Sequence, residues 1–280
     1  MTAAASARVA GVGLGLRAPL FRDLMTRAPA ALRWVEVSPE NHIGRGGFFE
    51  SMLADARGRY PVVTHGLSLG LGDREAPPRD FLRALRAFLE EVGSPWHSDH
   101  LCFGAVDGAH LHDLLPLPFT EASIRAVVDR VALLEDALGL PIAVENISWY
   151  AHPGDAAMGE ADFLQEITHR SGAGLLLDVN NAYVNARNHG TDAREFIRRV
   201  PADRVVQIHV AGHLTGADGF RVDTHGEAVC DEVYELLALA LARTGPVPVL
   251  LERDGGFPPF DELAAEIHRL DAIVRAAAAP

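Results

Sequence analysis

The sequence alternates eight times between a short apolar run and an amphipathic segment, and this alternation limits the folds open to the chain. The apolar runs are typical of buried strands and lie at Val9–Leu16, Arg33–Ser38, Pro61–His65, Pro95–Leu101, Pro141–Glu145, Gly174–Val179, Arg204–Val210 and Pro246–Glu252. The segments between them predict helices at Pro19–Arg27, Phe48–Arg57, Arg79–Val92, Thr120–Leu138, Glu160–Arg170, Asp192–Arg199, Glu227–Ala242 and Phe260–Ala276. Residues 102–118 are expected to form a longer loop.

Short connections between alternating strands and helices imply parallel strands joined by right-handed crossovers. The strand segments are mostly continuous apolar runs, as expected when helices cover one face of the sheet and a core fills the other. Eight such units in 280 residues predict an α/β fold, a (β/α)8 TIM barrel that forms a single domain over residues 1–280. In such a barrel, side chains at the carboxyl ends of the strands meet on one face.

Composition excludes several classes of function. The formal net charge of -13 makes nucleic acid and anionic membranes poor partners. All 25 basic residues are Arg, so there is no lysine for a Schiff base or for a P-loop. Cys102 and Cys230 are too few for a disulfide framework or a zinc finger. We find no apolar run long enough for a membrane helix and no secretory pattern in residues 1–10, and we therefore expect a cytoplasmic protein.

A glycine pattern in the first strand, Gly11-x-Gly13-x-Gly15, invites a dinucleotide-binding interpretation. The spacing departs from the dinucleotide fingerprint, so the signal is weak. The alternative is a strand whose glycines permit close packing at the barrel wall, and we favour it.

Nine side chains suited to metal binding stand at or near the predicted strand ends or in the loop after the seventh strand: His65, His100, Glu145, Asp178, Asn181, His209, Asp223, His225 and Glu252. Singly, each has an ordinary explanation, since a lone histidine is usually hydrogen-bonded and Asp178 or Asn181 could cap a turn. Together they would place imidazoles and repelling carboxylates in one small volume, and metal ions remove that cost. Nine nitrogen and oxygen ligands without cysteine suit two or three ions of iron, manganese or zinc, with Glu145 as a shared ligand.

Three further residues, His213, Asn146 and Tyr150, are expected beside this cluster. We interpret them as candidate catalytic residues that contact the substrate or support the metal ligands.

The motif series resembles one enzyme family. It comprises VTHGLS with His65, SDHL with His100, ENIS with Glu145, LDVNN with Asp178 and Asn181, IHVAGH with His209, DTHG with Asp223 and His225, and LERD with Glu252. In this order it is similar to the multinuclear non-haem iron-dependent oxidative enzymes of the methanobactin-oxidase type, over about Val9 to Leu270.

The resemblance implies a TIM barrel that holds two or three irons in mixed Fe2+ and Fe3+ states and uses O2 as co-substrate. By analogy, His65, His100 and Glu145 would hold one ion. Glu145 would bridge to a second ion, held also by Asp178, His209 and Glu252, and the third would take Asn181, Asp223 and His225. The family oxidises cysteine residues of ribosomally made precursor peptides, commonly with a separate protein that recruits the peptide. We expect both partners here.

Three alternatives stay open. The trinuclear-zinc apurinic endonucleases share the ligand order, but they would have histidine in place of Asn181 and need a basic surface for phosphates. A metal-dependent sugar isomerase or epimerase would need two metals and not the set of Asn181, Asp223 and His225. A non-catalytic metal-binding protein would not need its metals at the catalytic face of a barrel.

Overall fold

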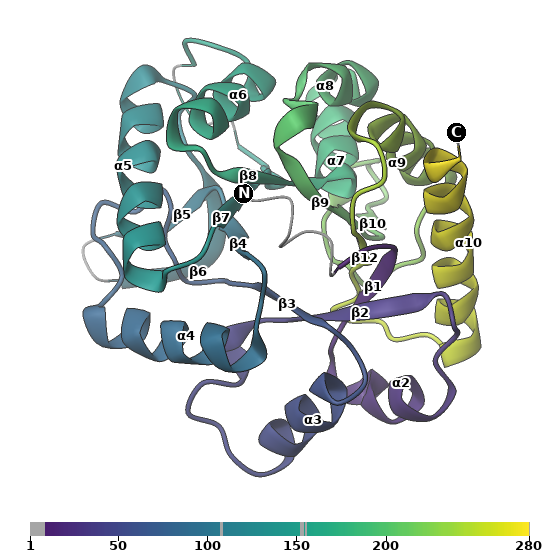
Figure 1. Ribbon diagram of the computed structural model, residues 1–280. Coiled ribbons are helices and arrows are strands. Elements are labelled where there is room, and N and C mark those ends of the chain that lie inside the picture. Colours follow the sequence, from purple (N-terminus) through teal and green to yellow (C-terminus); the bar gives the residue numbers. More distant parts are fainter. Residues whose placement is uncertain (1–8, 107–108, 152–153, 155, 280) are drawn as a thin grey trace.

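The computed structural model describes residues 9–106, 109–151, 154 and 156–279, so most of the Ala-rich start of the chain lies outside the described residues. Eight parallel strands close into a barrel in the order β1-β12-β9-β8-β7-β4-β3-β2, with helices around it (Figure 1). This confirms the predicted α/β fold, a (β/α)8 TIM barrel in a single domain. The strands are β1 (Val12–Gly15), β2 (Leu32–Val37), β3 (Val62–His65), β4 (His97–His100), β7 (Ile142–Glu145), β8 (Gly174–Asp178), β9 (Val205–Val210) and β12 (Val249–Leu251).

The outer layer consists of helices whose apolar faces pack on the barrel. They are α2 (Phe21–Arg27), α3 (Phe48–Arg57), α4 (Arg79–Val92), α5 (Glu121–Leu138), α6 (Glu160–Ser171), α7 (Val179–His189), α8 (Ala193–Arg199), α9 (Asp231–Thr244) and α10 (Phe260–Ala278). The start of α5 follows its sequence signal, because the hydroxyl of Thr120 accepts a hydrogen bond from the Ser123 amide at 3.3 Å. None of the helices in the described ranges is long and apolar enough to span a bilayer.

Three segments differ from the prediction. Residues expected to be a loop form an antiparallel hairpin, β5 (Cys102–Val106) and β6 (Ala109–Pro116), and the overlooked signal is the dipeptide Asp107-Gly108. A second, short hairpin joins β10 (Leu214–Thr215) and β11 (Arg221–Val222). Helix α7 is also absent from the prediction, since its buried face carries asparagines instead of the apolar repeat that marks most helices.

The barrel interior is built in two layers, because alternate side chains of each strand point inward. The layer nearer the amino ends is apolar and includes the fully buried Trp34 and Trp96 with Val63, Ala143 and Leu250. Two residues further along, the inward positions are polar in β2 (Glu36), β3 (His65), β7 (Glu145) and β9 (His209), whereas β1 has Gly15 there. The tryptophans thus fill the barrel beneath the polar layer, which lies nearer the carboxyl ends of the strands.

Gly13 shows why the first strand is rich in glycine. A Cβ atom at Gly13 would lie 2.4 Å from the ring of Trp34, so a side chain there cannot coexist with this packing. Close packing at the barrel wall therefore accounts for this glycine.

Candidate metal centre

Strand register brings the predicted ligands together. His100 of β4 is paired with Glu145 of β7, and Asp178 of β8 is paired with His209 of β9. All four occupy inward positions at the strand ends. Six of the predicted ligands at the strand ends and in α7 are buried: His65, Glu145, Asp178, Asn181, His209 and Glu252. His100 is partly buried. Asp223 and His225 reach the site from the loop after β9.

The first group consists of His65, His100 and Glu145. The Nε2 atoms of the two imidazoles are 3.3 Å apart, and they lie 3.2 and 3.4 Å from Oε2 of Glu145. Ligand atoms about 2.1 Å from one ion lie roughly 3.0–3.4 Å apart. The three atoms therefore have the spacing of ligands to a shared ion.

The second group consists of Glu145, Asp178 and His209, with Glu252 beside it. Nδ1 of His209 lies 3.3 Å from Oε1 of Glu145 and 3.0 Å from Oε2 of Glu252. Glu145 thus directs Oε2 to the first group and Oε1 to the second. This is the arrangement that a bridging carboxylate needs.

The third group differs in part from the set expected by resemblance. Asp178, His225 and Glu252 each offer an atom to it, and Oδ1 of Asp223 lies 2.8 Å from Nε2 of His225. Asn181 lies in the first turn of α7 and is buried. Its amide nitrogen donates to the Asn146 carbonyl at 3.0 Å, which leaves its Oδ1 free to act as a ligand.

Several buried atoms of this cluster make no hydrogen bond: Oε2 of Glu145, Oδ2 of Asp178, Oδ1 of Asn181, Nδ1 of His209 and Nε2 of His225. Buried polar atoms are nearly always paired, and each unpaired one costs about 1–3 kcal/mol. Five such nitrogen and oxygen atoms in one place are what ligands of bound metal ions would provide. The donor set is nitrogen and oxygen without cysteine, and it fits iron, manganese or zinc.

The electrostatics point the same way. Burial raises the pKa of Asp178 well above its usual value, and the charges of Glu145 and Asp223 add to the effect. Burial lowers the pKa of His65 well below its usual value, and His100 and His209 lower it further. Neighbouring carboxylates thus disfavour the charged form of Asp178, and neighbouring imidazoles disfavour that of His65. Bound cations would relieve the repulsion among the carboxylates.

Outer hydrogen bonds orient three of the imidazoles. Nδ1 of His65 lies 3.0 Å from the hydroxyl of Ser98, Nδ1 of His100 lies 3.3 Å from Oδ1 of Asp99, and Nε2 of His209 lies 3.2 Å from Oε2 of Glu36. Burial lowers the pKa of His100, but Glu145 and Asp99 together raise it to about 9. Sequence reasoning missed Glu36, whose signal was its position two residues after the inward Trp34.

The three candidate catalytic residues occupy different places. Asn146 is buried, and its amide both donates to and accepts from the Asp178 backbone at 2.9 Å, so it holds the end of β8. The hydroxyl of Tyr150 accepts from the Asp223 amide at 2.9 Å, and this side chain is 41% exposed. His213 contacts Asn180 at 2.8 Å, and Asn180 in turn donates to Asp223 at 2.6 Å. Tyr150 therefore contacts Asp223 directly, and His213 is linked to Asp223 through Asn180.

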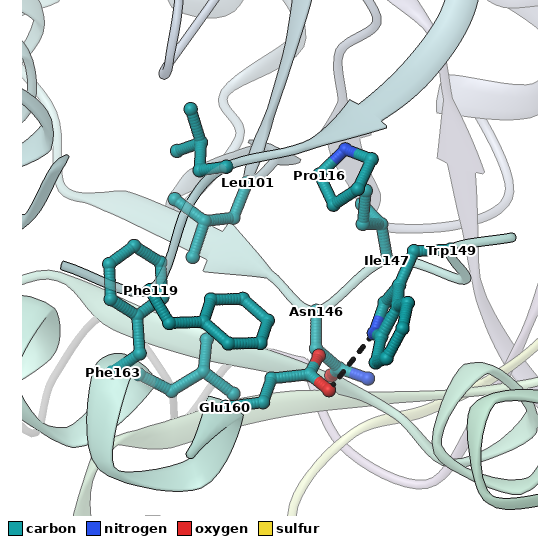
Figure 2. Close-up of a pocket in the computed structure, with 10 residues that line it drawn as sticks. Leu101, Pro116, Phe119, Asn146, Ile147, Trp149, Glu160 and Phe163 are labelled. Atoms are coloured by element: carbon teal, nitrogen blue, oxygen red, sulfur yellow. Dashed lines mark hydrogen bonds between the residues drawn. The ribbon is translucent and has the colours of Figure 1, made fainter. Parts of the chain in front are cut away.

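A small cavity lies behind the loop that follows Glu145. Figure 2 shows its lining, in which Phe119, Ile147 and Phe163 surround the contact between Trp149 and Glu160. Its volume is about 10 Å³, enough for roughly one water molecule. Burial raises the pKa of Glu160 to about 7. The cavity is too small for a substrate. The strand-end face is the candidate reaction site because the groups of metal-ligating side chains gather there.

The fold and the site together define the class of this chain. It is a (β/α)8 barrel protein with a candidate metal centre of imidazoles and carboxylates at the carboxyl ends of its strands. Two solved structures share the fold at low identity. The IOLI protein with a zinc atom has a TM-score of 0.58 at 14% identity over 96% of this chain and 98% of that one. Endonuclease IV from Thermus thermophilus has a TM-score of 0.56 at 15% identity over 95% of this chain and 99% of that one. Likeness at these identities shows the fold alone.

Sequence comparison is more specific. Residues 11–275 match the family described as RiPP precursor modification enzyme MbnB/TglH/ChrH, whose substrates are precursors of ribosomally synthesised, post-translationally modified peptides. The chain is also 43% identical over 257 residues to a UPF0276 protein of Caulobacter vibrioides (strain NA1000 / CB15N), covering 92% of this chain and 91% of that one. The chain belongs to this family of precursor modification enzymes.

Proposed function

We propose that this chain is a cytoplasmic, O2-dependent oxidase with two or three non-haem irons, and that it modifies cysteine residues of a ribosomally synthesised precursor peptide. The observation that carries the proposal is the position of Glu145, whose two oxygens face two separate groups of ligand atoms. The family match supports a peptide substrate. The nitrogen and oxygen ligands fit iron, and they fit manganese and zinc equally.

In this proposal, His65, His100 and Glu145 hold the first ion. Glu145, Asp178, His209 and Glu252 hold the second, and Asn181, Asp223 and His225 hold the third, with Asp178 and Glu252 close to both of the latter. Bound iron would supply a binding position for the substrate thiolate and the electrons that O2 accepts.

The protein side chains prepare the site for that chemistry. Ser98, Asp99 and Glu36 engage the outer nitrogens of three imidazoles, which keeps the inner nitrogens free for ligation. The ligand set contains no cysteine, so a substrate thiolate meets no competing protein sulfur; Cys102 is buried, and burial raises the pKa of its thiol. Tyr150 and His213, at the rim beside Asp223, are positioned to contact the peptide that carries the reacting cysteine.

A separate peptide-recruiting protein completes the proposal. In the described part of the chain, the elements outside the eight strand–helix units are the two hairpins β5–β6 and β10–β11, the additional helix α7 and short single turns. Recognition of a long precursor would then depend on a second protein.

The test is reconstitution. Protein loaded anaerobically with Fe2+ should bind two to three irons, and a mixed-valent pair should give an antiferromagnetically coupled electron paramagnetic resonance signal. With a cysteine-containing peptide encoded beside this gene, it should consume O2 and change the peptide mass at a cysteine. Zinc-loaded protein that cleaves abasic DNA would support the endonuclease alternative instead, and epimerisation of a ketose would support the isomerase.

A further inference from the structure

Asp254, just beyond the end of β12, links His225 to Arg17. Its Oδ2 lies 3.1 Å from Nδ1 of His225, and its Oδ1 accepts from Nε of Arg17 at 2.8 Å and lies 2.6 Å from a terminal nitrogen of the same guanidinium. The other carboxylate near Nδ1, that of Glu252, is farther away at 3.5 Å. Asp254 is therefore the nearer acceptor for a proton on Nδ1.

The backbone around this contact is held tightly. Within the described ranges, His225 is the one non-glycine residue with a positive φ, at 49°. The Asp254 amide donates to the His225 carbonyl at 3.1 Å. A Cβ atom at Gly256 would lie 2.3 Å from the Gly226 carbonyl oxygen, so the two loops pack backbone against backbone. This packing fixes His225 and Asp254 relative to each other despite the unfavourable φ of His225.

Gly15 leaves room for the third member of the link. A Cβ atom at Gly15 would approach Nη1 of Arg17 to 3.1 Å, which is tighter than an ordinary contact. The guanidinium occupies this space, lies within 4.0 Å of Glu252 and is only 20% exposed. The last glycine of the first strand therefore serves the placement of Arg17.

We infer that Asp254, held by Arg17, is the positioning residue for His225. An imidazole that ligates an ion is neutral and carries its proton on one nitrogen only. Asp254 accepts the proton of Nδ1 and so leaves the lone pair of Nε2, which lies 2.8 Å from Oδ1 of Asp223 without hydrogen-bonding geometry, to face an ion. The inference rests on the proposed metal centre, and it adds two residues outside the nine candidate ligands.

The experiment measures Fe2+ binding to the full-length apo protein under anaerobic conditions, by competition with a chelator, together with thermal unfolding of the apo protein. Asp254→Ala should weaken one site by about 10–100-fold and leave the others unchanged. Asp254→Asn, which keeps an acceptor oxygen, should recover part of that loss. The matched control is Asp261→Ala, because Asp261 is also an exposed acid paired with an arginine, at 2.9 Å from Arg27.

Without metal, the Asp254 variants should unfold at the same temperature as Asp261→Ala, because Asp254 is predicted to act on ion binding and not on the stability of the fold. Unchanged affinity at every site in Asp254→Ala would overturn the inference, and so would a lower unfolding temperature without a change in affinity. Wild-type protein that binds no Fe2+ would instead overturn the metal centre itself, and with it the proposed function.

Discussion

Oε2 of Glu36 lies 3.2 Å from Nε2 of His209, while Nδ1 of the same ring faces Glu145 and Glu252. The amide nitrogen of Gln207 donates to the same oxygen of Glu36 at 2.6 Å and lies 2.8 Å from Nε2 of His209, and its amide oxygen accepts from the indole nitrogen of Trp96 at 3.1 Å. A buried chain of hydrogen bonds thus runs from the apolar layer of the barrel to the candidate metal centre. It orients His209 so that Nδ1, and not Nε2, points at the other ligand atoms.

This relationship predicts that Glu36→Ala will reduce metal affinity by about 10–100-fold, because His209 loses the carboxylate at its outer nitrogen and keeps only the contact with Gln207 there. Glu36→Gln should lose less, since its amide oxygen still accepts from Nε2. Chelator competition on the two variants checks the order, with the exposed Glu50→Gln as control. Equal affinity in wild type and Glu36→Ala would contradict the orienting role.

Glu145 and Asn181 should differ in how many ions their substitution removes. Glu145→Gln takes one negative charge from between two groups of ligands and should lose at least two metals per chain. Asn181→Ala removes a single buried oxygen and should lose only the third ion. Elemental analysis of purified protein gives both numbers. Equal losses from the two variants would mean that Asn181 does not belong to a separate third site.

Much of the site could be predicted because strand parity is a local property. Once His65, Glu145 and His209 end their strands, a closed barrel must bring them to one face. Glu36 obeys the same parity, two residues after the inward Trp34, but the sequence alone does not show that its carboxylate turns to the outer nitrogen of His209, 173 positions away. Asp254 escaped this reasoning because it lies beyond the strand end, where parity no longer predicts direction.

A helix could be predicted from the sequence where its buried face is apolar, and it was missed where its buried face is polar. Helix α4 has the predicted bounds, Arg79–Val92, because leucine and phenylalanine repeat along one face. Helix α7 instead buries Asn181 and Asn185, which hydrogen-bond to the backbone at Asn146, Ile147 and Trp149. Its function is to hold the loop after Glu145, and asparagine has low helix propensity.

Close packing at Gly13 predicts a destabilised Gly13→Ala variant. The added methyl group would overlap the ring of Trp34 at 2.4 Å, and neither β1 nor the buried indole can move without disturbing the barrel. The expected loss is about 1–3 kcal/mol in the free energy of unfolding. Chemical denaturation of the metal-free protein measures it. Gly46→Ala, where the nearest atom is 3.8 Å away, is the control and should be close to neutral.

His97 predicts a dependence of stability on pH. It is fully buried, and burial lowers its pKa to about 4. The unfolded chain binds a proton near pH 6.5, so between these values it binds more protons than the folded chain. The contribution of His97 to the free energy of unfolding is therefore fully present above about pH 6.5. It decreases as the pH is lowered, by about 2 kcal/mol at pH 5.

Unfolding of the metal-free protein in urea at pH 7.5 and at pH 5 tests this expectation against His97→Gln, which cannot titrate. The variant is expected to be less stable at pH 7.5, because the contact of His97 with Thr64 at 3.0 Å is lost. The difference from wild type should shrink at pH 5. A difference that stays constant with pH would assign the instability of the variant to packing alone.

The last prediction concerns the substrate, and it rests on the family match together with a ligand set that, among the described residues, contains no cysteine. Iron-loaded protein should consume O2 with a cysteine-containing precursor peptide, with its partner protein present, and should be inactive on free cysteine. Replacing the reacting cysteine by serine should abolish turnover, because a hydroxyl is too weakly acidic to supply the anion that a thiolate supplies. Mass spectrometry of the peptide and oxygen uptake, measured together, separate modification from uncoupled oxidation. A serine peptide processed at a comparable rate would exclude thiolate binding, and modification that proceeds equally without iron would exclude the metal centre as its origin.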